Sequence, residues 1–154
     1  MANGMTNRGR KNMYDIVFRG ATAPTNFYVA LCTSAATPTA DTNTFGQLTE
    51  ISSGNGYTSG GYQLNRNTTD FDTLTEDDSN DRADLHVKDV TYTASGGNLP
   101  GSGNGARWAV LLDDNGTVAN REVWAWWDLG SDRTVSDGQD LTLQDLILRG
   151  GLLA

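Results

Sequence analysis

The stretch from Gly105 to Leu129, GARWAVLLDDNGTVANREVWAWWDL, holds two apolar runs joined by a polar segment. Within each run, every second residue is apolar. Many residues at the intervening positions, which point to the opposite face, are apolar too. This period of two is typical of β-strands, and apolar residues of both parities indicate strands covered on each face. The joining segment contains Asn115-Gly116, a dipeptide that tolerates the positive φ angles of a tight hairpin turn. The stretch predicts a long antiparallel hairpin at the centre of an all-β domain.

Three of the four tryptophans stand close together in the second run. Alternation places Trp124 and Trp126 on one face of this strand, and Trp127 on the other face with Val123 and Ala125. Because aromatic rings bury larger areas than most side chains, we expect these rings in the core. The alternative is an exposed platform that stacks on a carbohydrate, for which the candidate rings are Trp124, Trp126 and Tyr57.

Residues 7–19 are predicted to form a short helix, and Gly20 is a natural residue just past its C-terminus. A helix of this length is marginal alone, so we expect its apolar side to dock on the domain. The apolar positions at helical spacing are Met13, Ile16, Val17 and Phe18.

Short strands separated by turns are predicted for the rest of the chain. They cover residues 27–33, 62–66, 85–93 and 141–148, with turns at 130–133 and 136–138. In the last strand the alternation slips by one residue at Asp145, which indicates a β-bulge. The expected fold is an all-β, jelly-roll-like antiparallel β-sandwich with one short N-terminal helix.

Residues 70–84 are strongly acidic, and Arg82 is the one basic residue among them. Such oxygen-rich segments can bind calcium, but the ordered ligand spacing around a central glycine that marks an EF-hand is missing. We therefore expect a solvated acidic surface loop and no metal site.

The charge of the chain is unevenly distributed. The formal net charge is −8 over 154 residues, which argues against nucleic acid as a partner. Residues 1–20 carry four basic residues and one acidic residue, a net +3 that leaves −11 on the remainder. A basic arm on an acidic body can reach an acidic neighbour, including another copy of the chain.

Targeting and membrane signals are not evident. The N-terminal residues have no apolar stretch of the kind found in signal peptides, and no apolar run approaches the roughly 20 residues needed to span a bilayer. We expect a protein that is made in a cytoplasm, has no membrane partner and keeps its single cysteine, Cys32, as a buried thiol.

No catalytic constellation stands out. His86 is the only histidine, and no nucleophile elbow or metal-ligand spacing accompanies it. Glycine-rich matches such as Gly54-x-Gly56 precede no helix, so nucleotide binding is unsupported. We expect no enzyme activity, no cofactor and no bound metal.

Several short motifs follow one another along the chain in a characteristic order. They are Phe18-Arg19-Gly20, Phe27–Ser34 (FYVALCTS), Leu48–Ile51 (LTEI), Gly60-Gly61-Tyr62 with Arg66, Trp108-Ala109-Val110, Asp113–Gly116 (DDNG), and Val135-x-Asp137-Gly138-x-x-Leu141-x-Leu143. This order resembles a family of small virion structural proteins of tailed bacteriophages, of the head-decoration, minor tail and fibre-associated types. The resemblance implies assembly into a particle in the host cytoplasm rather than catalysis.

Together these observations predict a virion structural protein, with capsid decoration (cement) as the leading role and a tail or fibre-associated component as the alternative. A carbohydrate-binding sandwich is the second alternative. We divide the chain into a basic arm and helix (1–20), a β-sandwich (21–149) and an apolar tail (150–154). The expected partners are other virion proteins, such as the major capsid protein or tail proteins, and further copies of the chain. The residues predicted to contact them are Arg8, Arg10, Lys11, Arg19, Leu152 and Leu153.

Overall fold

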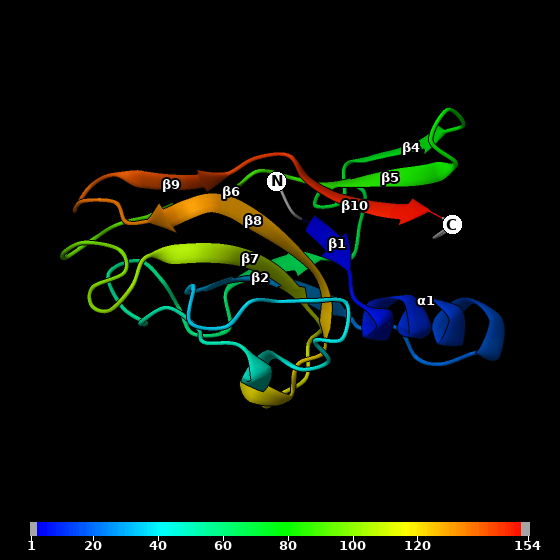
Figure 1. The fold of residues 1–154 in the computed structure, drawn as a ribbon, viewed down its shortest axis with the longest axis horizontal. Helices are drawn as coiled ribbons and strands as arrows, with labels where there is room; N and C mark the ends of the chain where they lie inside the picture. The colour runs from blue at the N-terminus through cyan, green and yellow to red at the C-terminus, as the bar shows by residue number, and fades with distance from the viewer. Residues whose placement is uncertain (1–2, 152–154) are drawn as a thin grey trace.

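The computed structural model describes residues 3–151 and shows an antiparallel β-sandwich with a helix near the N-terminus, which confirms the predicted fold class (Figure 1). The larger layer is a five-stranded sheet in the order β1-β8-β7-β2-β3. Its strands are β1 (Asn3–Met5), β2 (Asn26–Cys32), β3 (Tyr62–Asn65), β7 (Ala106–Leu112) and β8 (Val123–Arg133). The other layer contains β4 (Thr73–Asp77), β5 (Arg82–Val87), β6 (Val90–Thr93), β9 (Asp140–Leu143) and β10 (Leu146–Gly151). The helix α1 spans Asn7–Arg19, and two 3₁₀ turns are η1 (Phe45–Gln47) and η2 (Val118–Asn120).

The hairpin predicted in 105–129 is present as β7 and β8, but its tight Asn115-Gly116 turn is wrong. A ten-residue connection that includes η2 joins the strands, and neither Asn115 nor Gly116 has a positive φ. Hydrogen bonds of the Asp113 side chain fix the shape of this loop. Asp113 Oδ1 accepts the N–H of Asn115 at 3.2 Å and that of Glu122 at 3.0 Å. Together with the backbone hydrogen bond from the Asp113 N–H to the Glu122 carbonyl at 3.2 Å, these side-chain bonds close the base of a wide loop in place of a two-residue turn.

A second correction concerns the faces of β8. The pairing shifts between Leu111↔Ala125 and Leu112↔Val123, which leaves Trp124 as an extra, bulged residue. A bulge puts two residues opposite one, so the alternation slips at that point. Trp124 consequently packs in the same core cluster as Trp127, and not on the face of Trp126 as the alternation predicted.

The turn expected at 130–133 is also wrong, because it is an irregularity within β8 rather than the end of the strand. The paired positions jump from Trp108↔Asp128 to Ala106↔Arg133, so the extra residues bulge out and pairing then resumes. Gly130 has a φ of +82° there, and its N–H donates to Asp128 Oδ1 at 2.7 Å. A residue without a Cβ accommodates this left-handed conformation at low cost.

The second layer is a long ribbon with a short interruption. β5 pairs with β10 through Val87↔Leu146, and β6 pairs with β9 through Val90↔Leu143, so the register is the same on both sides. The single strand expected at 85–93 is thus two strands. The bulge predicted at Asp145 is wrong, because a bulge would have shifted the register. Asp145 instead breaks the strand with a φ of +57°.

The acidic segment forms a β-hairpin, which corrects the expected loop. β4 and β5 pair from Thr73↔His86 to Asp77↔Arg82, and β4 is an edge strand. Arg82 lies among the carboxylates and forms salt bridges with Asp77 at 3.2 Å and Asp84 at 3.0 Å. The cross-strand pairing of the one basic residue with acidic neighbours explains how so charged a segment can adopt sheet structure.

Both faces of the five-stranded sheet are buried, as the apolar residues of both parities predicted. One face packs on the second layer through a cluster that includes Val29, Leu31 and Leu111. The other face packs under the loops around η1 and η2 through Cys32, Trp108 and further residues of the second cluster. Burial of Cys32 confirms its expected place in the core, and the same burial raises the pKa of its thiol.

Candidate docking surface

The helix α1 begins and ends where the sequence predicts. Thr6 is its N-cap and accepts the N–H of Gly9 at 2.8 Å, and Gly20 ends it with a φ of +72°. The N-terminal half of the helix is fastened to β8, because Gly9 is buried against the backbone of Trp124. Asn12 adds a hydrogen bond to Glu122. The helix is therefore docked by a close approach of its first turns.

The apolar side of the helix is not buried, contrary to expectation. Among the predicted docking residues only Ile16 packs against the core, while Met13, Val17 and Phe18 are 42%, 69% and 78% exposed. Tyr14 is also exposed, and its ring lies 6.3 Å from that of Phe18. Figure 1 shows why: α1 projects past the sheet, so its second half has little to pack against. Exposed apolar side chains that are adjacent on one element mark an interaction surface.

An apolar groove of about 590 Å³ lies beside this helix. Helix α1, β1 and the β4–β5–β10 sheet contribute to its walls. Apolar residues from these elements and from the core include Met5, Met13, Phe27, Leu74, Leu85 and Leu148. Leu74 is 71% exposed, although it is a large apolar residue on an edge strand. The groove forms where elements far apart in the sequence pack together, so no local sequence pattern predicts it.

The predicted basic contact residues lie on α1, and they have partners within the chain. Arg8 forms a salt bridge with Glu122 at 3.2 Å, and Arg19 forms one with Asp15 at 3.3 Å. Lys11 also pairs with Asp15, and its hydrogen bond lowers the pKa of that carboxyl. Arg10 is hydrogen-bonded to Asn7 at 3.4 Å. Since such surface pairs are weak, the basic side chains can exchange partners at modest cost.

The predicted apolar contact residues, Leu152 and Leu153, lie outside the described residues. The strand before them ends beside the groove: Gly150 pairs with Ala83 and lines it. Both glycines that were assigned to the tail belong to β10, and β1 of the N-terminal arm pairs with β8. Both ends of the described chain are thus integral to the sandwich.

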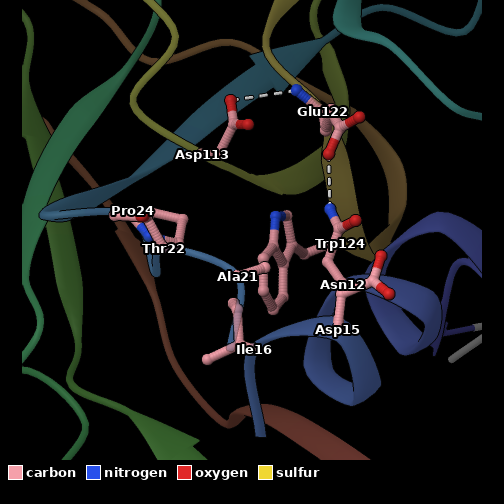
Figure 2. A pocket seen from close by; sticks show the side chains of 9 residues that line it. All are labelled: Asn12, Asp15, Ile16, Ala21, Thr22, Pro24, Asp113, Glu122 and Trp124. Carbon is pink, nitrogen blue, oxygen red and sulfur yellow. Dashed lines mark hydrogen bonds between the residues drawn. The ribbon is translucent and has the colours of Figure 1, made fainter. Parts of the chain in front are cut away.

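A smaller pocket of about 150 Å³ lies on the other side of α1, where the helix meets the loop between β7 and β8 (Figure 2). Asp15, Asp113 and Glu122 line it. Burial raises the pKa of Asp113, and Figure 2 shows its carboxylate accepting the N–H of Glu122. Glu122 in turn accepts from Asn12. Each of these carboxylates already has a partner within the chain. The hydrogen bonds from Asn12 to Glu122 and from Glu122 to Asp113 join the helix to the loop.

The remaining charged and titratable residues considered as candidates, Asp70 and His86, take part in the packing of the fold. Asp70 is buried, and its carboxylate accepts from Lys88 at 2.6 Å and from the N–H of Asn65 at 2.6 Å. The bond from Lys88 is the main cause that lowers the pKa of Asp70. His86 lies within β5, paired with strands on both sides. Within residues 3–151, no three His, Cys, Asp or Glu side chains gather closely enough to hold a metal ion.

The rings proposed for a carbohydrate platform are largely covered. Trp124 and Tyr57 are 6% and 3% exposed, and the Tyr57 hydroxyl is hydrogen-bonded to Glu50 at 2.7 Å. Trp126 is partly buried, and the backbone of Gly4 lies against its ring. A stacking platform needs an open ring face. The burial of Trp124 and Tyr57 removes two of the three candidate rings.

No protein-family model, curated protein or solved structure matches this chain. Across residues 3–151, none of the helices has the length and apolar character needed to cross a bilayer.

Proposed function

We propose that this chain is a non-enzymatic structural protein of a tailed-bacteriophage virion and acts as a capsid decoration subunit. The observation that carries the proposal is the exposed apolar side of α1 beside an apolar groove, because such a surface suits binding to another protein. The order of motifs, which resembles small virion structural proteins, supports the same class of function.

The mechanism needs no chemistry. A subunit that binds only the assembled shell stabilises it by mass action, by about 2.7 kcal/mol per site when its free concentration is a hundred times Kd. In this proposal the basic side chains of α1 attract carboxylates on a neighbouring virion protein, and Leu152 and Leu153 enter an apolar groove on that neighbour. The net charge of −8 favours a protein partner over nucleic acid.

Quantitative mass spectrometry of purified particles, from the phage whose genome carries this gene, tests the proposal. Hundreds of copies per particle are expected for a decoration subunit. A handful of copies would contradict decoration and point to a tail or fibre-associated component. Absence from particles in which the major capsid protein is readily detected would overturn the virion assignment altogether.

A further inference from the structure

The exposed large apolar side chains of the described chain gather at one end of the molecule. Tyr62 apart, those in residues 3–151 are on α1 and β4: Met13, Tyr14, Val17, Phe18 and Leu74. Figure 1 places α1 and the β4–β5 hairpin at the same end, with β10 between them. Large apolar patches of this kind are uncommon on monomers that have no partner.

The groove and the apolar side of the helix are continuous. Met13 lines the groove and belongs to the exposed side of α1 as well. Val17 follows it one turn later on the same side of the helix, and Phe18 packs with Tyr14 in the adjacent row. Leu74 forms part of the opposite wall of the groove. The same surface therefore has both a projecting row of apolar side chains on α1 and an apolar groove beside it.

The α1 side of this surface carries basic residues and the β4 side carries acidic ones, and Arg66 also lines the groove between them. Arg10 and Lys11 lie on the helix, and the Lys11 side chain is 61% exposed. On the other side, Glu76 is exposed and stands two residues after Leu74 in β4, so the two side chains share a face of the strand. Asp72 is exposed as well and lies directly before the first residue of β4. A surface that is basic at one edge and acidic at the other is complementary to its own copy turned by a two-fold rotation.

We infer that a second copy of this chain docks on this surface in a two-fold dimer. Helix α1 of each copy lies in the groove of the other, with Val17 and Phe18 against Leu74. Arg10 and Lys11 of one copy then face Asp72 and Glu76 of the other copy. The two-fold symmetry repeats this contact, so the dimer has it twice. This inference deepens the proposed assembly role and rests on it only for its biological purpose.

Sedimentation velocity of the full chain over a range of concentrations, at low and high ionic strength, measures the dimer directly. Two charge-reversed variants provide the sharpest test: Arg10→Glu with Lys11→Glu, and Asp72→Lys with Glu76→Lys. Each variant alone is expected to dimerise about tenfold more weakly than the wild type at low ionic strength, because like charges then meet. An equimolar mixture of the two variants is expected to form a heterodimer of wild-type affinity, because both contacts are complementary again.

The apolar contact has its own variant. Val17→Ser with Phe18→Ser is expected to weaken the dimer by about 10- to 100-fold, because it exposes the partner's groove to water. Tyr62→Ser, at the exposed apolar residue outside the patch, is the matched control and should leave the dimer unchanged. Circular dichroism confirms that each variant is folded.

Several results would overturn the inference. A wild-type chain that stays monomeric at every concentration excludes the dimer. Failure of the mixed variants to associate excludes the charge pairing. Loss of the dimer on removing 152–154, with no effect of the Val17 and Phe18 substitutions, would assign the groove to the tail instead. Particle occupancy is measured separately, so a monomer that still joins particles overturns the dimer alone, and a dimer absent from particles overturns the proposed function alone.

Discussion

Gly9 of α1 lies against the backbone of Trp124 in β8, so close that a Cβ on Gly9 would stand 2.5 Å from the Trp124 carbonyl oxygen. Backbone atoms in a bulged strand cannot move aside as a flexible side chain can. The contact explains a glycine in the first turns of a short helix, where alanine would favour helix formation by about 1 kcal/mol. Gly9 is thus the point at which the helix meets the sheet.

We expect Gly9→Ala to destabilise the protein despite the better helix propensity of alanine, by about 1–3 kcal/mol from steric overlap. Urea denaturation followed by tryptophan fluorescence measures the change. Gly116→Ala is the matched control, because no atom lies within 4 Å of its added Cβ, and we expect it to be neutral. A Gly9→Ala variant as stable as the wild type would mean that α1 is not held at this contact.

Trp108 is expected to be the most sensitive ring of the core cluster beneath η1 and η2. It is 7% exposed and packs with Val110 and Leu112 from the same strand. Trp108→Ala should cost about 3–5 kcal/mol of unfolding free energy, because it leaves a large cavity. The matched aromatic control is Tyr14→Ala on the helix, which is 62% exposed and should change the unfolding free energy by less than about 0.5 kcal/mol. Equal losses in the two variants would contradict the division into core and surface.

The ion pair of Asp70 and Lys88 should give the protein a distinct acid sensitivity. The hydrogen bond from Lys88 lowers the pKa of Asp70 in the folded state, so its contribution is complete above the unfolded-state value of about 3.9. That contribution is lost as the pH falls through the lower folded-state pKa. Asp70→Asn should cost about 2 kcal/mol at neutral pH, because it removes a charged hydrogen bond from a buried site.

Denaturant titrations between pH 7 and pH 2 check this prediction. The difference in stability between the wild type and Asp70→Asn should begin to shrink below about pH 4, where Asp70 of the unfolded chain becomes protonated. It should go on shrinking until the pH passes the lower folded-state pKa, where the native carboxyl is protonated as well. Asp78→Asn, at an exposed position in the turn between β4 and β5, is the control and should leave the unfolding free energy close to that of the wild type. A constant difference at every pH would show that the Asp70 carboxylate is not the group responsible.

Local patterns predicted the elements of this fold well. The helix at 7–19, the strand near 27–33 and the central hairpin all follow from periodicity and from residues such as Gly20 that end elements. These signals are local, since apolar spacing and caps act within a few residues. The errors occur where side-chain hydrogen bonds or a partner strand decide the backbone. Asp113 bonds to Asn115 and Glu122 and so fixes a wide loop in the hairpin, and the bulge at Trp124 reverses a predicted face.

The candidate surface was predicted only in part. Charge bias predicts Arg10 and Lys11 as contact residues, and this stays a prediction. Helical spacing singled out Met13, Val17 and Phe18, although as a buried side, and the structure shows them exposed. Whether an apolar side of a helix is covered depends on where the helix ends relative to the sheet, which periodicity does not encode. The groove needs Met13 and Leu74 to meet, and these residues come from segments that only the tertiary fold brings together.

The last prediction concerns the two kinds of contact proposed with a neighbouring virion protein. A buried leucine is worth about 1.5–3 kcal/mol, whereas an exposed ion pair is worth about 0–1 kcal/mol. We therefore expect Leu152→Ser with Leu153→Ser to lower occupancy on purified particles strongly at every salt concentration. We expect Arg10→Ala with Lys11→Ala to slow binding mainly at low ionic strength, where charges steer association.

Substitutions serve this test better than removal of residues 1–11, because that deletion would also remove β1 and Gly9, which belong to the folded sandwich. Binding of each purified variant to particles that lack the protein, followed over time at two salt concentrations, separates rate from final occupancy. Arg133→Ala, at the far end of β8, is a control that changes charge away from α1. If both double variants bind at the wild-type rate and reach wild-type occupancy in low and high salt, neither contact holds the chain on the particle.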